Sequence, residues 1–277
     1  MVLIMSYQIR KKSDVTYITF PLFEKLGVVH GFSTKEGGVS KGCYQSMNLS
    51  FSRGDDRDCV AKNHRKFAEA VGYDVESLVF SDQVHDTKIR RVTKDDCGKG
   101  IFRERDYQGI DGLMTNDPAV TLITFYADCI PLFFCDPVEK VVAMAHSGWR
   151  GTVGKIGEKM VDKLQQEFSC KKENIFVAIG PGICKDCYEV SEDVILKFQQ
   201  EFSQKNWEKL YTAKGNHKYQ LDLWKANEIL LTESGILPEH IEVSGLCTAC
   251  HSDLLFSHRV NGDKRGNLAG VISGEGL

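Results

Sequence analysis

A chain of 277 residues with 42% hydrophobic and 26% charged residues is long enough to bury a large core. Its formal net charge of -3 excludes the strongly basic surface of many nucleic-acid-binding proteins, so we expect no nucleic-acid partner. No stretch is apolar enough to predict a membrane span, and the apolar run at residues 1–6 is too short for a signal peptide. Ten cysteines without a secretory signal predict a reducing, cytoplasmic environment.

The hydrophobic pattern predicts strands and helices that interleave along the whole chain. Strands are predicted at 15–20, 27–32, 77–80, 87–92, 119–126, 130–135, 139–146, 175–180, 241–246, 253–258 and 267–273. Helices are predicted at 58–71, 152–168, 191–203 and 222–234. Because no repeat or linker interrupts the chain and no strict βαβ rhythm appears, we predict a single domain, 1–277, of the α+β class with mixed sheets.

Three short segments each place a metal-binding side chain at or just after an apolar run that predicts a strand. They are Gln83-Val84-His85, Ala127-Asp128-Cys129 and Ala145-His146-Ser147. Two imidazoles and one thiolate suit zinc, and three protein ligands leave a fourth position open, as in catalytic zinc sites. Taken singly, each residue is more often part of a core or a loop, so the prediction depends on the fold bringing His85, Cys129 and His146 together.

The segment after His146 predicts a turn from a strand into a helix. Glycines at 148, 151 and 154 follow Ser147, and free backbone N–H groups at such a turn suit an anion such as phosphate. The alternative is that the glycines only allow close packing of the helix on the strand.

Two C-x-x-C pairs, Cys184/Cys187 and Cys247/Cys250, have the form of a four-cysteine structural zinc site. The two pairs lie far apart in sequence, yet a globular fold can bring them together. A thioredoxin-like redox role is less favoured, because neither pair opens a helix after a first strand. These pairs are the rival metal site to the three-ligand set.

A series of motifs in a fixed order resembles the YfiH/YlmD-type laccase-domain family, once described as multicopper polyphenol oxidases and now as purine nucleoside phosphorylases. The motifs include Gly31-Phe32-Ser33-Thr34, Gly37-Gly38-Val39-Ser40, Asn63-His64-Arg65, Gln83-Val84-His85, Asp111-Gly112-Leu113, Ala127-Asp128-Cys129, His146-Ser147-Gly148-Trp149-Arg150-Gly151, Gly180-Pro181-Gly182-Ile183, Tyr188-Glu189-Val190 and Phe256-Ser257-His258-Arg259. They extend over nearly the whole chain.

The resemblance implies a layered α/β/β/α fold and Zn²⁺, rather than copper, at His85, Cys129 and His146. It implies phosphorolysis of adenosine, inosine, guanosine and 5′-methylthioadenosine to the base and ribose 1-phosphate, together with adenosine deaminase activity. The expected partners are therefore purine nucleosides and phosphate, and we expect a monomer or a weak homo-oligomer. The family pattern does not require cysteine at 184, 187 or 250, which argues against a shared zinc there.

Two departures from the family pattern both replace an arginine. Lys35 stands where the loop usually has arginine, and Gly266-Asn267 stands where Gly-Arg is usual. Each change removes a guanidinium group that could bind an anion through two hydrogen bonds.

We assign the remaining roles from the mechanism of phosphorolysis, in which phosphate attacks C1′ of the ribose while the purine leaves. Asp128 is the predicted proton donor, and its alternative role is a hydrogen bond that fixes the turn. Tyr188 and Phe32 are predicted to stack on the purine. The predicted phosphate-binding residues are Ser147, Gly148 and Arg150, assisted by Ser33, Thr34 and Lys35.

Three other functions stay open, one of which is a non-catalytic binding module stabilised by a four-cysteine metal. A cysteine amidase or peptidase, for example in cell-wall precursor editing, is possible because Cys129 with His85 or His146 also forms a nucleophile and base. A copper-dependent phenol oxidase is less favoured, because none of the eight histidines forms a His-x-His pair of the laccase type.

Overall fold

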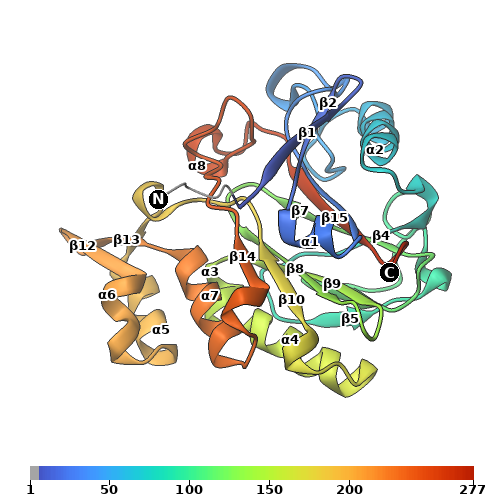
Figure 1. Ribbon diagram of the computed structural model, residues 1–277. Coiled ribbons are helices and arrows are strands. Elements are labelled where there is room, and N and C mark those ends of the chain that lie inside the picture. Colours follow the sequence, from blue (N-terminus) through green and yellow to red (C-terminus); the bar gives the residue numbers. More distant parts are fainter. Residues whose placement is uncertain (1–5) are drawn as a thin grey trace.

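The computed structural model describes residues 6–277 and contains two six-stranded mixed sheets (Figure 1). The first sheet has the order β1-β2-β3-β15-β7-β4. Its strands are β1 (Gln8–Lys12), β2 (Val15–Thr19), β3 (Val29–Ser33), β15 (Leu268–Ser273), β7 (Thr121–Tyr126) and β4 (Leu78–Phe80). The β4–β7 pair is parallel and the other neighbours are antiparallel.

The second sheet has the order β14-β10-β8-β9-β6-β5. Its strands are β14 (Ile241–Val243), β10 (Phe176–Ile179), β8 (Ile130–Asp136), β9 (Val141–Ser147), β6 (Gly112–Thr115) and β5 (Ile89–Arg91). A separate three-stranded sheet is formed by β11 (Glu189–Ser191), β13 (Lys218–Leu221) and β12 (Tyr211–Gly215).

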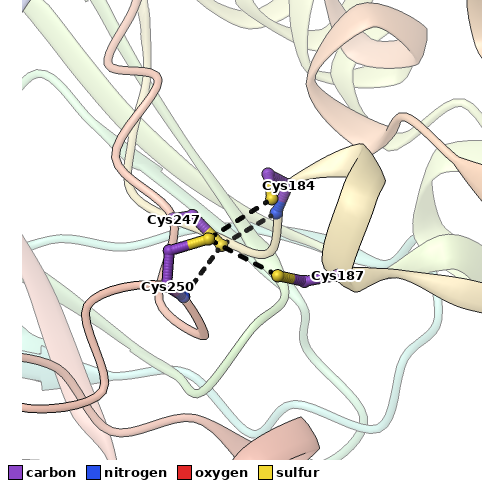
Figure 2. Close-up of side chains that lie close together, drawn as sticks. All are labelled: Cys184, Cys187, Cys247 and Cys250. Carbon is purple, nitrogen blue, oxygen red and sulfur yellow. Dashed lines mark hydrogen bonds between the residues drawn. The ribbon is translucent and has the colours of Figure 1, made fainter.

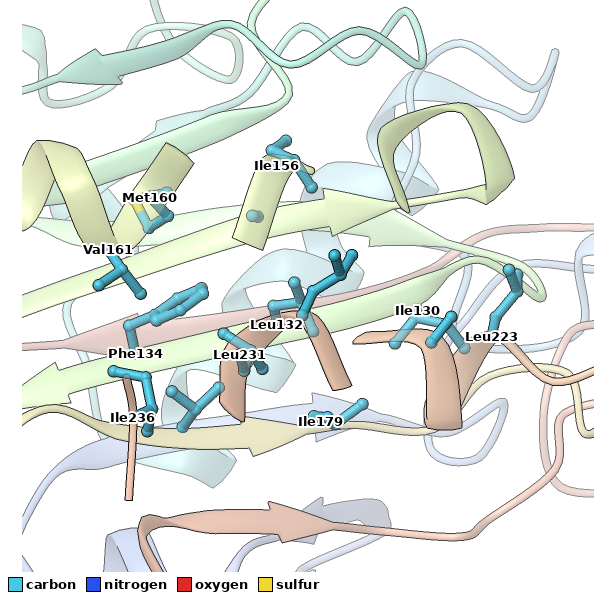
Figure 3. Close-up of a cluster of buried hydrophobic side chains, with 14 of the residues drawn as sticks. Ile130, Leu132, Phe134, Ile156, Met160, Val161, Ile179, Leu223, Leu231 and Ile236 are labelled. Atoms are coloured by element: carbon cyan, nitrogen blue, oxygen red, sulfur yellow. The ribbon is translucent and has the colours of Figure 1, made fainter. Parts of the chain in front are cut away.

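Both faces of the central strands are buried, which explains their nearly continuous apolar sequences. In β8, Leu132 and Phe134 pack on one side with the helices that cover the second sheet, as Figure 3 shows. Phe133 lies on the other side, among side chains of both six-stranded sheets such as Phe32 and Leu122. The two sheets therefore pack face to face around a shared apolar layer.

Helices cover the outer face of each sheet. The helices are α1 (Pro21–Lys25), α2 (Arg57–Val71), α3 (Trp149–Val153), α4 (Ile156–Phe168), α5 (Glu192–Glu201), α6 (Trp207–Leu210), α7 (Leu223–Glu233) and α8 (His258–Asn261). Helix α2 packs on the first sheet through Phe67, while α4 and α7 pack on the second through Met160 and Leu231 (Figures 1 and 3). The predicted α+β class with mixed sheets and the α/β/β/α layering are confirmed.

Helix boundaries follow local capping signals, with one error in the prediction. Helix α2 begins where the Asp56 side chain accepts a hydrogen bond from the Cys59 N–H, and it ends at Gly72 in a left-handed conformation. The helix predicted at 152–168 is two helices, because Lys155 adopts a left-handed backbone with φ of 59° that ends α3 and precedes α4. The turn brings Gly154 too close to the Thr87 side chain for any residue with a Cβ atom.

The strand predicted at 253–258 is wrong. This stretch forms turns that lead into α8, and its apolar residues Leu255 and Phe256 are buried between the sheets without pairing as a strand. The sequence pattern also missed β1, β6 and the whole three-stranded sheet.

Within residues 6–277, no helix is both long enough and apolar enough to cross a bilayer. The apolar run predicted to be too short for a signal peptide falls mainly on residues 1–5, which lie outside the described residues.

Because two histidines are buried, we predict that the free energy of unfolding is lower at acidic pH. Burial lowers the pKa of His30 and of His64 from 6.5 to about 4, although each hydrogen-bonds a backbone carbonyl. The unfolded chain therefore binds more protons than the folded chain between these values, so the free energy of unfolding falls as the pH falls from 6.5 towards 4. The loss is up to about 3 kcal/mol per histidine.

Urea unfolding near neutral pH and at about pH 5 measures this effect. A buried histidine takes up a proton on unfolding chiefly when the pH lies between its pKa in the folded chain and its pKa in the unfolded chain. The variant His64→Gln is expected to lose less stability on acidification than the natural protein. An unchanged pH dependence in the variant would contradict the assignment.

Candidate functional site

The fold brings the three predicted ligands together where the two sheets connect. His85 lies in the loop between β4 and β5, Cys129 in the turn between β7 and β8, and His146 near the end of β9. Their ligand atoms all lie within 4.8 Å of one another, and Cys129 Sγ is 3.9 Å from His85 Nε2. The turn at Cys129 is where the chain passes from the first sheet to the second, which makes this meeting point a consequence of the topology.

A buried carboxylate, Asp111, orients both histidines. Its Oδ1 lies 2.8 Å from His146 Nδ1, and its two oxygens accept hydrogen bonds from the backbone N–H groups of Val84, His85 and Asp86. These bonds hold the loop in which His85 adopts a positive φ of 63°. Because Nδ1 of His146 donates to the carboxylate, its Nε2 is left free to bind a metal. The sequence motif contained Asp111, but its role was not predicted.

The charged forms of Cys129, His146 and Asp111 stabilise one another. Burial opposes ionisation of Cys129, but the imidazoles of His146 and His85 lower the pKa of its thiol to about 6. Burial also disfavours the charged form of His146, yet the Cys129 thiolate and Asp111 raise its pKa to about 9. Burial likewise opposes the charge of Asp111, and its bonds to His146 and backbone N–H groups hold its pKa below the ordinary value. Cys129 is therefore a thiolate near neutral pH, as metal binding requires, and an ion bound at His146 Nε2 would displace the proton that the raised pKa keeps there.

The donor set fits a zinc ion. Sulfur and two imidazole nitrogens are the usual ligands of zinc, with bonds of about 2.3 Å to sulfur and 2.0–2.1 Å to nitrogen. Gly148 leaves the space that an ion needs, since a Cβ atom there would lie 3.0 Å from Cys129 Sγ and 3.1 Å from the His85 ring. Thiolate and imidazole ligands also suit copper, so the donor atoms alone fit either metal.

A cavity of about 950 Å³ opens beside the three ligands. Pockets of this size accommodate ligands larger than a single nucleoside. Its walls are rich in aromatic and cationic side chains, and they include Phe51, Phe80, Phe125, Tyr126, Arg53, Arg57, Arg103, Arg105, Arg265, His85, Cys129 and His146. The cavity can therefore hold an apolar ring and an anion next to the metal site.

Two of these arginines have hydrogen-bonding capacity to spare. Arg265 is only 9% exposed, and its Nε has no partner. Within residues 6–277 it forms no ion pair, and its Nη1 donates instead to the Gly266 carbonyl and to Asn267. Burial, with Arg53 nearby, lowers its pKa. The Nε of Arg53 is also buried without a partner, while its Nη2 bonds Asp263. Arg265 is nearly buried and Arg53 is half-buried, and guanidinium groups with an unpaired N–H at the wall of a cavity are stabilised by binding an anion.

The side chains predicted to bind phosphate do not line this cavity. The hydroxyls of Ser33, Thr34 and Ser147 are completely buried in hydrogen bonds within the protein, to Ala269, to Thr16, and to Thr152 and Asn227 respectively. These three side chains are not available to a ligand, and the reason is that each fixes a neighbouring strand or helix.

The other predicted contacts are also placed differently. Lys35 Nζ donates to the Ser252 carbonyl at 2.5 Å. Arg150 is exposed above the Trp149 ring, and Tyr188 packs against Arg259. Gly148 alone of the predicted phosphate-binding residues lies directly beside the metal ligands.

One further prediction is corrected, and the geometry of Asp128 bears on another. Phe32 is fully buried between the sheets, so it cannot stack on a ligand. Asp128 accepts hydrogen bonds on both carboxylate oxygens, from the Thr248 hydroxyl at 2.6 Å and from the Arg259 N–H at 2.6 Å. Both oxygens are occupied as acceptors within the protein, so the geometry favours the alternative role of Asp128 in fixing the turn before Cys129.

Known proteins resemble this chain over most of its length. The chain is 39% identical over 249 residues to a protein named purine nucleoside phosphorylase YlmD from Bacillus subtilis (strain 168), covering 88% of both chains. It is 32% identical over 276 residues to purine nucleoside phosphorylase LACC1 from Homo sapiens, covering 95% of this chain and 59% of that protein.

Solved structures show the same fold. The crystal structure of YlmD from Geobacillus stearothermophilus matches with a TM-score of 0.89 and 35% identity, covering 96% of this chain and 98% of the other. The model of the family described as multi-copper polyphenol oxidoreductase laccase matches residues 29–275. The chain therefore belongs to this family, the YfiH/YlmD-type laccase-domain proteins that its sequence motifs resemble.

Proposed function

We propose that this protein is an enzyme that uses inorganic phosphate to cleave purine nucleosides at a site containing a zinc ion. The names of its relatives support this reaction. The observation that carries the proposal is that one cavity is lined both by the three metal ligands and by two arginines with unpaired Nε groups. The aromatic part of the same cavity suits a purine ring.

In this proposal His85, Cys129 and His146 hold the ion, and Asp111 keeps His146 in the tautomer that ligates. When bound there, zinc supplies a Lewis acid that polarises a substrate oxygen and lowers the pKa of a coordinated water to about 7. Gly148 keeps the space between the ligands free of a side chain.

The arginines act on the phosphate. In phosphorolysis a phosphate oxygen forms a bond to C1′ of the ribose while the bond from C1′ to the purine nitrogen breaks. The purine leaves with the bonding electrons and takes up a proton that the phosphate gives up, directly or through water. Arg265 and Arg53 hold the phosphate in position and neutralise part of its charge. The binding energy of these contacts offsets the entropic cost of bringing the phosphate and the nucleoside together. The two arginines take the role that the sequence pattern had given to Ser147 and Arg150.

The proposed substrates are adenosine, inosine, guanosine and 5′-methylthioadenosine. We propose adenosine deamination, in which water replaces the 6-amino group and ammonia leaves, as a second activity of the same site.

Incubation of adenosine with the zinc-loaded protein, with and without phosphate, separates the two activities. Ribose 1-phosphate and adenine are expected only with phosphate, because phosphate is a reactant, whereas inosine and ammonia are expected in both incubations. Sulfate in place of phosphate is the matched control for ionic strength and anion binding.

The proposal would be overturned if none of the four nucleosides gave a phosphate-dependent sugar phosphate, which is ribose 1-phosphate from the first three and 5-methylthioribose 1-phosphate from 5′-methylthioadenosine. Turnover that survives zinc chelation but is lost on alkylation of Cys129 would indicate a cysteine hydrolase instead. Phenol oxidation that depends on added copper would indicate the oxidase that the family description names.

A further inference from the structure

Four cysteine sulfurs meet at a second place, away from the three-ligand site. Cys184 precedes the short 3₁₀ helix Lys185–Cys187 after β10 and Cys187 ends it, while Cys247 and Cys250 lie in the loop after β14 (Figure 2). The four sulfurs all lie within 4.8 Å of one another, although the two pairs are far apart in sequence. All four cysteines are free thiols.

The spacing of the sulfurs matches a tetrahedral zinc site. With zinc–sulfur bonds of about 2.3 Å, the sulfurs at the corners of a tetrahedron are about 3.8 Å apart. The observed distances are 3.8 Å between the sulfurs of Cys184 and Cys250 and 3.5 Å between those of Cys187 and Cys250. These two distances match the tetrahedral spacing, and all four sulfurs lie within 4.8 Å of one another, as the ligands of a single ion must.

The backbone around the cluster is arranged to stabilise a thiolate. The N–H groups of Cys184 and Cys250 point to the sulfur of Cys247, at 3.3 and 3.4 Å (Figure 2). Cys247 is buried, and hydrogen bonds from the backbone to a sulfur ligand are typical of well-ordered metal sites. The Cys184 N–H comes from the other C-x-x-C segment, so its bond also fixes the two segments relative to each other.

We propose that Cys184, Cys187, Cys247 and Cys250 bind a second zinc ion with a structural role. Four protein ligands close the coordination sphere, in contrast to the open three-ligand site. The proposal concerns this chain in particular, because the family pattern does not require cysteine at 184, 187 or 250.

The second ion stabilises the turn that carries Cys129. Beside the cluster, the Thr248 N–H donates to the Gly182 carbonyl at 3.0 Å. From the same two segments, the Thr248 hydroxyl donates to Asp128 Oδ1 and the Ile183 N–H donates to the Asp128 carbonyl. Asp128 directly precedes Cys129, so loss of the second ion loosens the support of one ligand of the first.

The number of zinc ions per chain tests the proposal. The protein purified in zinc-containing, metal-chelator-free buffer is expected to hold two ions, Cys129→Ser one, and Cys187→Ser/Cys250→Ser one. If the three-ligand site does not hold zinc, the natural protein and Cys129→Ser both hold one ion and only the double variant loses it. Failure of the proposed function and failure of this inference therefore give different patterns.

Two controls guard against misfolding. Cys43→Ser removes an exposed thiol outside both clusters and is expected to keep two ions. Cys250→His retains a ligand of zinc at the exposed corner of the cluster, so it is expected to keep the second ion and to unfold at a temperature closer to that of the natural protein than the double serine variant does.

Cobalt bound in place of zinc reports the ligands directly, through absorption that arises from thiolate coordination. Cobalt-loaded Cys129→Ser is expected to retain the signal of a four-thiolate site. A Cys129→Ser protein that is folded and holds no metal, or a double variant that holds as much zinc as the natural protein, would overturn the proposal.

Discussion

Replacing Cys129 with serine is expected to remove the ion from the three-ligand site and to lower kcat/KM for purine nucleosides by at least about 100-fold. Loss of residues that merely orient metal ligands already costs about 10- to 100-fold, and loss of a ligand costs more. The thiolate is the softest of the three donors, and its low pKa depends on His146 and His85, so a hydroxyl cannot replace it. Zinc content and initial rates, measured on the same preparation, give both results.

Cys43→Ser is the matched control for this change, because its thiol is exposed and lies outside both cysteine-containing clusters. It is expected to keep the zinc content and the rate of the natural protein. A Cys129→Ser protein that turns over nucleosides at the normal rate would show that the three-ligand site is not the catalytic centre.

Replacing Arg265 with alanine is expected to raise the KM for phosphate and to lower kcat/KM for phosphate by about 10- to 150-fold. This range corresponds to the loss of a hydrogen bond to a charged group, about 1.5–3 kcal/mol. Arg265 is buried, has a free Nε and lines the cavity next to the metal ligands, so solvent screens its attraction for phosphate only weakly. Phosphate titrations at saturating nucleoside measure the effect.

Two further variants make the Arg265 test specific. Arg10→Ala removes an exposed arginine that pairs with Glu24, and it is expected to leave the KM for phosphate unchanged. Arg150→Ala separates the two hypotheses for phosphate binding, because Arg150 was predicted from the sequence turn whereas Arg265 is found in the cavity. A rise in KM with Arg150→Ala and not with Arg265→Ala would place phosphate at the turn after β9.

The parts of the fold with a strong periodic pattern could be predicted from the sequence. Helix α2 has a capping aspartate and a terminal glycine, and β7, β8 and β9 are long runs buried on both faces. The small three-stranded sheet was missed although β12 and β13 form a local hairpin, because most residues of β12 are exposed and its sequence has no run of apolar residues. The apolar run at 253–258 misled for the opposite reason, since its buried residues pack between the sheets without strand pairing.

The candidate site shows the same division. His85, Cys129 and His146 each end a recognisable apolar run, so their meeting could be predicted. Arg53 and Arg265 could not, because they come from loops at opposite ends of the chain, and their role appears only when both lie beside the cavity. The hydroxyls of Ser33 and Ser147 misled because a conspicuous motif can serve internal hydrogen bonding rather than a ligand.

The most direct test is a crystal structure of the zinc-loaded protein with an anomalous difference map recorded at the zinc absorption edge. We expect a peak within about 2.0–2.3 Å of His85 Nε2, Cys129 Sγ and His146 Nε2, with phosphate soaked into the crystal bound at Arg265. A map without a peak between these three atoms, in crystals whose protein retains phosphate-dependent turnover, would contradict the account.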